Sequence, residues 1–338
     1  GLPPMVGFLV AGFAYNFMGF QTPDSLQAVA DLGVTLLLFS IGLKLKIEDL
    51  ATAEVWGTSV IHLICSTAFF TGTILVGQQL FDTAILDLSL FAIVAGAGAS
   101  GAINQWYDRD IDAIMLRTRN RPIPSGAVEP AEALSFGLVI SALSGLLLGL
   151  ASNWFAAGLL AFTIFFYGVV YSIWLKRRTP QNIVIGGAAG ALPPVIGWVA
   201  VTGTMPIEPL ILFAIIFMWT PPHFWALAIA RKEEYAKVEI PMLPVTHGSR
   251  YTAVHSLLYT LMLFVASLLP VATGLSSWIY LIGASALGGV FIYQAVLLLR
   301  TMKNSDAMKM FRFSIVYLMA IFPIMLLDHY LLPKPLFS

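Results

Sequence analysis

Charged residues are scarce in this sequence. Only 11% of its 338 residues are charged, whereas about a quarter of the residues are charged in a soluble globular domain. The chain is 58% hydrophobic and its mean hydropathy is +0.85, so it holds more apolar side chains than an aqueous core could bury. These figures exclude an ordinary soluble enzyme and indicate that lipid surrounds much of the protein.

Cysteine and net charge are also nearly absent. The one cysteine, Cys65, excludes an internal disulfide and a metal centre built from cysteines. Eighteen basic residues balance eighteen acidic ones, so the formal net charge is zero. A nucleic-acid partner would therefore receive no overall electrostatic support, and none is expected.

Long apolar runs are abundant. A membrane-spanning helix needs about 20 mostly apolar residues, and these runs are continuous rather than alternating, which favours helices over strands. We therefore predict an all-α integral membrane protein with about eleven spans. The spans are expected near 1–20, 27–43, 56–80, 84–104, 133–150, 153–174, 183–202, 208–228, 254–275, 278–300 and 310–332.

The basic residues give these spans an orientation. Fifteen of the eighteen lie in every second loop, at 109–121, 176–178, 231–250 and 300–312. The connections between those loops carry none. Because loops rich in lysine and arginine stay inside, these four loops and the N-terminus are expected on the cytoplasmic side, together with the polar chemistry.

One polar stripe carries the most information about function. Asn104, Asp108 and Asp112 are spaced four residues apart, so on a helix they share one face. Three oxygen-bearing side chains at the end of a membrane helix are costly, and carboxylates suit Mg²⁺ that is shared with substrate phosphates. Three arginines, whose planar groups suit phosphate oxygens, follow within ten residues: Arg117, Arg119 and Arg121. The pattern predicts a metal–diphosphate site; the alternative is a solvated loop whose charges pair among themselves.

Residues 104–126 resemble the first signature of the UbiA superfamily of membrane prenyltransferases. Within the superfamily, Pro-Pro-His-Phe-Trp at 221–225 and Ile-Pro-Met-Leu-Pro-Val at 240–245 resemble the haem O synthase group. Further similar blocks follow in the family's order, and the resemblance covers about 84–338. These blocks are Tyr-Ser-Ile-Trp-Leu-Lys-Arg at 171–177, the Gly/Ala-rich segment with a proline pair at 186–198, and 219–235.

The resemblance implies a UbiA-type helical bundle and a Mg²⁺-dependent reaction. A farnesyl group would pass from farnesyl diphosphate to a vinyl group of haem B (protoheme IX), giving haem O. It further implies a bacterial inner (plasma) membrane, with the active site facing the cytoplasm. Contact with haem-copper oxidase assembly or with haem A synthase would fit that product. Prenylation of another acceptor, such as a quinone precursor, stays an alternative.

The resemblance also assigns roles to residues. Asn104, Asp108 and Asp112 would hold Mg²⁺. The second acidic motif of the superfamily has Ala230 at its first position here and Glu234, a further expected metal ligand, at its second. Residues expected to bind the substrates, by diphosphate contact, by supporting the second motif or, for Tyr171, by lining the isoprenoid cavity, are Asn104, Arg117, Arg121, Tyr171, Lys176, Arg231 and Tyr235. Lys176 has the alternative role of an ordinary anchor beside Arg177 and Arg178.

His223 follows two prolines on a very apolar run. As a substrate-side group it would bind the haem iron or handle a proton at the vinyl group. As a core histidine it would serve packing alone. The sequence leaves both readings open.

The first quarter of the chain has a different character. Residues 2–12 and 30–44 resemble the opening helices of Kef-type monovalent cation:proton antiporters. We therefore expect 1–83 to be antiporter-like helices, a fusion or fragment, and 84–338 to be the prenyltransferase domain without its usual first helix. A cation:proton antiporter is accordingly the alternative function from another class.

Overall fold

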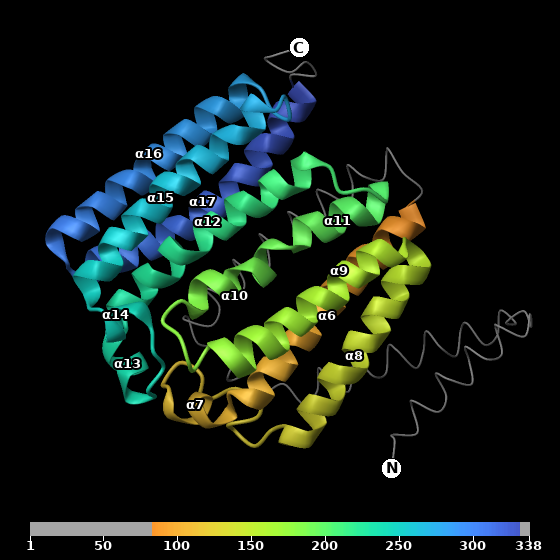
Figure 1. The fold of residues 1–338 in the computed structure, drawn as a ribbon, viewed down its shortest axis with the longest axis horizontal. Coiled ribbons are helices and arrows are strands. Elements are labelled where there is room, and N and C mark those ends of the chain that lie inside the picture. Colours follow the sequence, from red (N-terminus) through yellow and green to blue (C-terminus); the bar gives the residue numbers. More distant parts are fainter. Residues whose placement is uncertain (1–82, 332–338) are drawn as a thin grey trace, which may run out of the picture. The chain divides into compact units, whose positions relative to one another are not determined.

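The computed structural model describes residues 83–331, and every regular element in that part is helical (Figure 1). The predicted antiporter-like segment and the three predicted spans before residue 83 lie outside the described residues. The elements are α6 (Thr83–Tyr107), α7 (Arg109–Ile114), α8 (Pro130–Ala151), α9 (Trp154–Phe165), η2 (Phe166–Leu175), α10 (Asn182–Ala191), α11 (Pro193–Thr202), α12 (Ile207–Ala230), α13 (Lys232–Lys237), α14 (Leu243–Thr246), α15 (Ser249–Ala272), α16 (Trp278–Thr301) and α17 (Asn304–Leu331).

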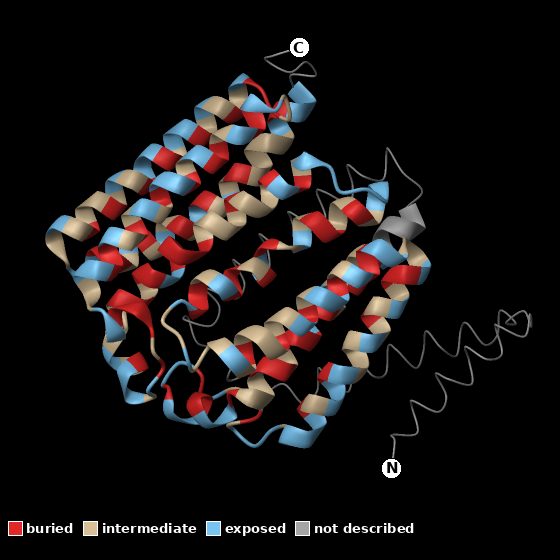
Figure 2. Cartoon of the chain, in the orientation of Figure 1, coloured by how far each residue is buried: buried red, intermediate tan, exposed pale blue. Residues whose placement is uncertain are grey.

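Eight helical stretches in this part are long and apolar enough to cross a membrane, and they confirm the eight spans predicted from residue 84 onward. Exposed residues recur along every long helix (Figure 2). Many of them are large and apolar: Phe91 is 64% exposed, Leu150 63% and Ile282 68%. Water would penalise such surfaces, whereas hydrocarbon does not, so the outer faces are suited to lipid.

Two predicted spans are less regular than uniform α-helices. The stretch near 153–174 changes from α-helix to the π-helix η2 at Phe166. The stretch near 183–202 divides at Pro193, because a proline has no N–H with which to continue the ladder of hydrogen bonds. Apolar content predicts that a segment spans the membrane, but it does not report these local changes of geometry.

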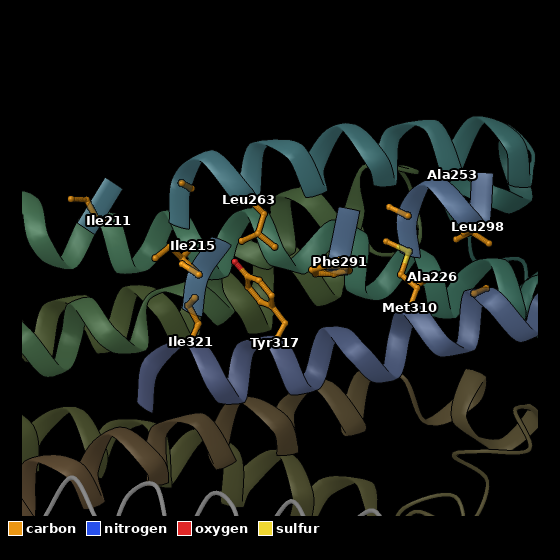
Figure 3. Packing of buried hydrophobic residues seen from close by; sticks show 14 of the residues in the cluster. Ile211, Ile215, Ala226, Ala253, Leu263, Phe291, Leu298, Met310, Tyr317 and Ile321 are labelled. Carbon is orange, nitrogen blue, oxygen red and sulfur yellow. The ribbon is translucent and has the colours of Figure 1, made fainter. Parts of the chain in front are cut away.

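The largest buried cluster lies among α12, α15, α16 and α17. Leu263, Phe291 and Tyr317 meet between these helices, as Figure 3 shows. The Tyr317 hydroxyl lies 2.6 Å from Ser267 Oγ, so its polar end is satisfied inside the cluster. Asp328 has a similarly structural place, since its carboxylate accepts backbone N–H groups of Ser277 and Tyr280 at the start of α16.

A second cluster holds α6 against α8, α9 and α11. Gly137 of α8 lies so close to α6 that a Cβ would come within 2.7 Å of Ile103 Cγ1 and 3.2 Å of the Ala99 carbonyl oxygen. A glycine is therefore required for these two helices to pack at this separation.

A third, smaller cluster joins the short elements that follow the membrane helices. Figure 1 shows α7, α13 and α14 at the same end of the described helices. Apolar residues of α7, α10, α12 and α13 pack there with the extended segment 240–242. The buried members are Ile111, Met115, Ile183, Ala228, Tyr235, Ile240 and Met242. This cluster brings the two acidic sequence motifs to one end of the bundle.

Candidate active site

The Asn-Asp-Asp stripe runs across the junction of α6 and α7. Backbone hydrogen bonds of 2.9 Å from Asp108 N to Asn104 O and of 2.8 Å from Asp112 N to Asp108 O carry the helical path through the junction. The three side chains therefore lie on successive turns of one face. All three are buried, with 8% of Asn104, none of Asp108 and 4% of Asp112 exposed.

Each buried carboxylate of this stripe is paired with a cation. Lys176 Nζ donates to Asp108 Oδ2, and Arg121 Nη1 donates to Asp112 Oδ2 at 2.7 Å. A buried carboxylate without a partner would be strongly unfavourable, and these pairs give each acid a nearby opposite charge. The structure thus brings together Asn104, Asp108 and Asp112 with Lys176 and Arg121.

The π-helix η2 delivers Lys176 to the acidic stripe. Its widened turn shows in hydrogen bonds that span five residues, from Lys176 N to Tyr171 O at 2.8 Å and from Ser172 Oγ to Tyr167 O at 2.8 Å. π-Helical turns are frequent at functional sites because they re-aim side chains. Here Ser172 and Lys176, one turn apart, both face α6.

Ser172 is a site residue that the sequence argument missed. Its fully buried Oγ accepts a hydrogen bond of 2.9 Å from Asn104 Nδ2, which also donates to Asp108 Oδ2 at 3.0 Å. Both amide hydrogens of Asn104 are therefore used, and the group that Asn104 offers to a ligand is its carbonyl oxygen. The four-residue spacing from Ser172 to Lys176, which puts both on one side of a helix, is the sequence signal that could have identified it.

A third ion pair lies beside the stripe. Arg177 binds Asp110 through both terminal nitrogens, at 2.8 Å and 2.7 Å. The hydrogen bonds from Arg177 hold the pKa of Asp110 below its ordinary value, and hydrogen bonding to Asp110 raises the pKa of Arg177. The sequence predicts only an ordinary anchor at Arg177 and no role for Asp110.

The second acidic motif lies on α13. Glu234 Oε1 accepts a hydrogen bond of 2.6 Å from Arg231 Nη1, which immediately precedes the helix. Tyr235 points into the small apolar cluster with Ile111 and Met115, residues of α7 and of the turn after it. Tyr235 therefore ties the second motif to the first by apolar packing.

His223 lies apart from these acids, inside α12. Its ring stacks on Trp219 at 4.2 Å and on Phe311 of α17 at 4.7 Å between centroids. Its Nδ1 lies 2.6 Å from Ser314 Oγ, and that hydroxyl also donates to the Phe311 carbonyl at 2.6 Å. The hydrogen bond and the ring contacts of His223 are with α12 and α17.

The remaining predicted substrate residues differ in their surroundings. Tyr171 packs its ring against Gly186 of α10, where a Cβ would come within 2.2 Å of Tyr171 Cδ2. Arg117 is exposed in the segment after α7. The structure thus places Tyr171 at a helix contact and leaves Arg117 at the surface.

The donor set suits a hard cation. Asp108 Oδ1 and Glu234 Oε2 are buried oxygens without a hydrogen-bond partner in the described part of the chain, although Arg177 Nη2 lies 3.7 Å from Asp108 Oδ1. Residues 83–331 contain no group of three or more His, Cys, Asp or Glu side chains arranged around one metal position. Mg²⁺ needs no such cage, because it commonly takes one or two carboxylates and completes its shell with phosphate oxygens and water.

Comparisons with known proteins identify the family. The family model described as the UbiA prenyltransferase family matches residues 64–319. The chain is 58% identical over 255 residues to the protoheme IX farnesyltransferase of Hyphomonas neptunium, covering 73% of this chain and 80% of that one. It is 51% identical over 276 residues to that of Agrobacterium fabrum (80% and 86% covered) and 45% identical over 302 residues to that of Granulibacter bethesdensis (86% and 95% covered).

Solved structures show the same fold. A structure of digeranylgeranylglyceryl phosphate synthase superposes with a TM-score of 0.63 at 21% identity, covering 81% of this chain and 92% of that one. The apo structure of a UbiA homologue from Aeropyrum pernix K1 gives a TM-score of 0.61 at 20% identity, with 80% and 97% covered. At such identities the likeness establishes the helical architecture, and the family follows from the sequence matches: this chain is an integral membrane protein that belongs to the UbiA prenyltransferase family.

Proposed function

We infer that this protein transfers a farnesyl group from farnesyl diphosphate to a vinyl group of haem B, which makes haem O. Diphosphate leaves, a carbon–carbon bond forms to the vinyl group, and water adds to the resulting cation with loss of a proton. The observation that carries this inference is the 58% identity to a protoheme IX farnesyltransferase over 73% of the chain. The buried acidic stripe with its paired cations supplies the chemistry that such a transfer requires.

The difficult step is departure of the diphosphate, because negative charge develops on the leaving oxygens. Cationic groups that are already in place lower this barrier, since they need not reorganise during the reaction. Lys176 and Arg121 are in place, held by Asp108 and Asp112 at the end of α6 and in α7. We propose that these two cations bind the diphosphate, joined from the surface by Arg117.

The acidic residues would hold Mg²⁺. Asn104, Asp108 and Asp112 supply oxygen ligands from one helix face, and Glu234, with a buried oxygen free of hydrogen bonds, would supply one from α13. Bound Mg²⁺ would neutralise charge on the departing diphosphate. Arg231 orients Glu234 through the bond of 2.6 Å, so its role is to position that ligand.

We assign the acceptor side to His223 and Tyr171. Ser314 Oγ lies within hydrogen-bond distance of both the Phe311 carbonyl and His223 Nδ1, and a hydroxyl carries one hydrogen. We propose that Ser314 donates to the carbonyl and accepts from His223 Nδ1–H. That tautomer leaves Nε2 with a free lone pair, which a ligand to haem iron or a proton acceptor requires. Tyr171, packed against Gly186 of α10, and Tyr235, packed against α7, would hold their helices in place around the site.

The basic loops support a cytoplasm-facing site in a bacterial inner membrane. Arg121, Lys176 and Arg231 belong to three of the four basic loops that the positive-inside rule assigns to the cytoplasm. The substrate diphosphate is a charged, water-soluble headgroup, and this orientation would admit it directly from the cytoplasm.

The test is product formation by the purified protein. Incubation in detergent with haem B, farnesyl diphosphate and Mg²⁺ is expected to give haem O, identified by mass spectrometry. The isosteric variants Asp108→Asn and Asp112→Asn are expected to lose this activity, while Glu233→Gln, an exposed neighbour of the second motif, retains it. Prenylation of 4-hydroxybenzoate without any haem O would overturn the assignment in favour of a quinone-type acceptor.

A further inference from the structure

We propose that Arg177 and Asp110 form a clamp that positions the first acidic motif against η2, and that Asp110 is a positioning residue rather than a metal ligand. The kinetic consequence of this clamp rests on the proposed function. Its structural consequence, an ordered α6–α7 junction, does not.

Asp110 lies on the wrong face of the helix to join its neighbours in binding metal. It is two residues from both Asp108 and Asp112, and two residues correspond to a rotation of about 200° around an α-helix. Its side chain is 61% exposed, whereas those of Asp108 and Asp112 are 0% and 5% exposed. Asp108 and Asp112 therefore point into the site, whereas Asp110 points away from it.

Arg177 holds this segment through several contacts at once. Besides the two bonds to Asp110, its Nη2 donates to the Tyr107 carbonyl at 3.1 Å, and its guanidinium lies 4.6 Å from the centre of the Tyr107 ring. Two-pronged binding by a planar guanidinium fixes both distance and orientation, which a lysine in its place could not do.

These contacts lie at the junction of α6 and α7, which the Asn-Asp-Asp stripe crosses. Tyr107 ends α6 and Asp110 belongs to the first turn of α7, so Arg177 binds both sides of Asp108, the residue at the junction. Carbonyls at a helix end need outside partners, and Arg177 supplies one. The Tyr107 hydroxyl donates a hydrogen bond of 3.3 Å to the Ile173 carbonyl of η2. The end of α6 and the segment from η2 to Arg177 therefore each donate a hydrogen bond to the other.

The clamp also sets the place of Lys176. Because Lys176 precedes Arg177 in the chain, fixing Arg177 against Asp110 holds the Lys176 backbone beside Asp108. Asn182 Nδ2 supports the same turn by donating to the Lys176 carbonyl at 2.9 Å. Adjacent basic residues thus have different tasks. Lys176 donates to the buried Asp108, whereas the two short bonds of Arg177 go to the exposed Asp110 and Asp108 Oδ1 lies further away, at 3.7 Å.

Arg178 provides the matched control. It carries the same charge one residue further along, and it is exposed. The variants are Arg177→Gln, Arg177→Lys, Asp110→Asn, the Asp110→Asn/Arg177→Gln pair and Arg178→Gln. Two measurements on the detergent-purified full chain are needed: hydrogen–deuterium exchange of residues 108–115, and the Mg²⁺ concentration that gives half-maximal haem O formation.

Arg177→Gln and Asp110→Asn are each expected to speed exchange in 108–115 and to raise the half-maximal Mg²⁺ concentration about tenfold, as is usual when a residue that orients ligands is lost. Arg177→Lys should resemble Arg177→Gln because lysine keeps the charge but cannot form two parallel hydrogen bonds to the Asp110 carboxylate. The double variant should be no worse than Arg177→Gln alone, and Arg178→Gln should match the wild type.

Three results would overturn the clamp. The first is an Arg177→Gln variant that behaves like Arg178→Gln in both measurements. The second is a double variant whose effects are the sum of the two single effects. Wild-type behaviour of Arg177→Lys would count equally against the clamp. The third is a rise in the Mg²⁺ requirement of Asp110→Asn without faster exchange, because that pattern would make Asp110 a ligand. Wild-type protein that forms no haem O would refute the proposed function instead, and the exchange data would still decide the clamp.

Discussion

Lys176 Nζ and Asp108 Oδ2 form an ion pair between residues 68 positions apart in the sequence, joining the end of η2 to the end of α6. Asp108 is fully buried and Lys176 is 20% exposed at its side chain, so the pair lies at the inner edge of the site. One member comes from the proposed metal-binding stripe and the other from the proposed diphosphate-binding set. Their contact brings the two proposed sets of residues together.

Removing the cation of this pair is expected to harm both folding and turnover. Lys176→Met leaves the buried Asp108 carboxylate with the Asn104 amide and, as its nearest cation, the more distant Arg177; loss of one partner of a buried ion pair costs about 3 kcal/mol. The free energy of unfolding can be followed by thermal denaturation in detergent, and haem O formation should fall about a hundredfold. Lys237→Met, an exposed change on α13, is the control. Unchanged turnover in Lys176→Met would contradict the assignment of Lys176 to the diphosphate.

Two glycines of α10 should respond in opposite ways to alanine. At Gly186 a Cβ would lie 2.2 Å from Tyr171 Cδ2, so the ring must move, and such overpacking costs about 1–3 kcal/mol. At Gly190 nothing lies within 4 Å, and alanine in a helix should be neutral or stabilise by about 0.5–1 kcal/mol. Thermal denaturation of Gly186→Ala and Gly190→Ala checks this contrast. Equal midpoints would mean that the Tyr171 contact with α10 is absent in the protein.

Comparing variants of Glu234 and its neighbour Glu233 distinguishes a metal-ligand role of Glu234 from an effect of net charge alone. Glu233 is exposed, whereas Glu234 is bound by Arg231 and has a buried oxygen without a hydrogen bond. Glu234→Gln should raise the Mg²⁺ concentration needed for half-maximal activity about tenfold or more. Glu233→Gln removes the same charge and should leave that concentration unchanged. If the two variants respond alike, Glu234 acts only through the net charge of α13.

His223 can be tested through haem binding rather than turnover. His223→Gln removes the nitrogen lone pair that we assign to the acceptor, and the absorption spectrum of haem B added to the purified protein should change or weaken. His329→Gln, an exposed change near the end of α17, serves as the control. Ser314→Ala, which frees Nδ1, should shift the spectrum without abolishing binding. A wild-type haem spectrum in His223→Gln would return His223 to a packing role.

The sequence alone predicted those features that depend on a single segment of the chain. Continuous apolar runs located all eight spans that the structure describes, because a membrane selects segments by length and hydropathy. The four-residue spacing placed Asn104, Asp108 and Asp112 on successive turns, since helix geometry alone sets that periodicity. The motifs likewise identified the family, which the comparisons confirmed.

The tertiary structure alone decided which polar groups meet. The π-helical turn of η2, invisible to hydropathy, aims Ser172 and Lys176 at α6. Tyr235 lies beside the first acidic motif because of apolar packing, which no pattern of charge in the sequence indicates. The pairing of Arg177 with Asp110 spans 67 residues of sequence, and which basic residue meets which acid depends on how the helices pack. Sequence thus determined what each segment is, while helix packing determined which side chains share a site, because those contacts form only after the helices associate.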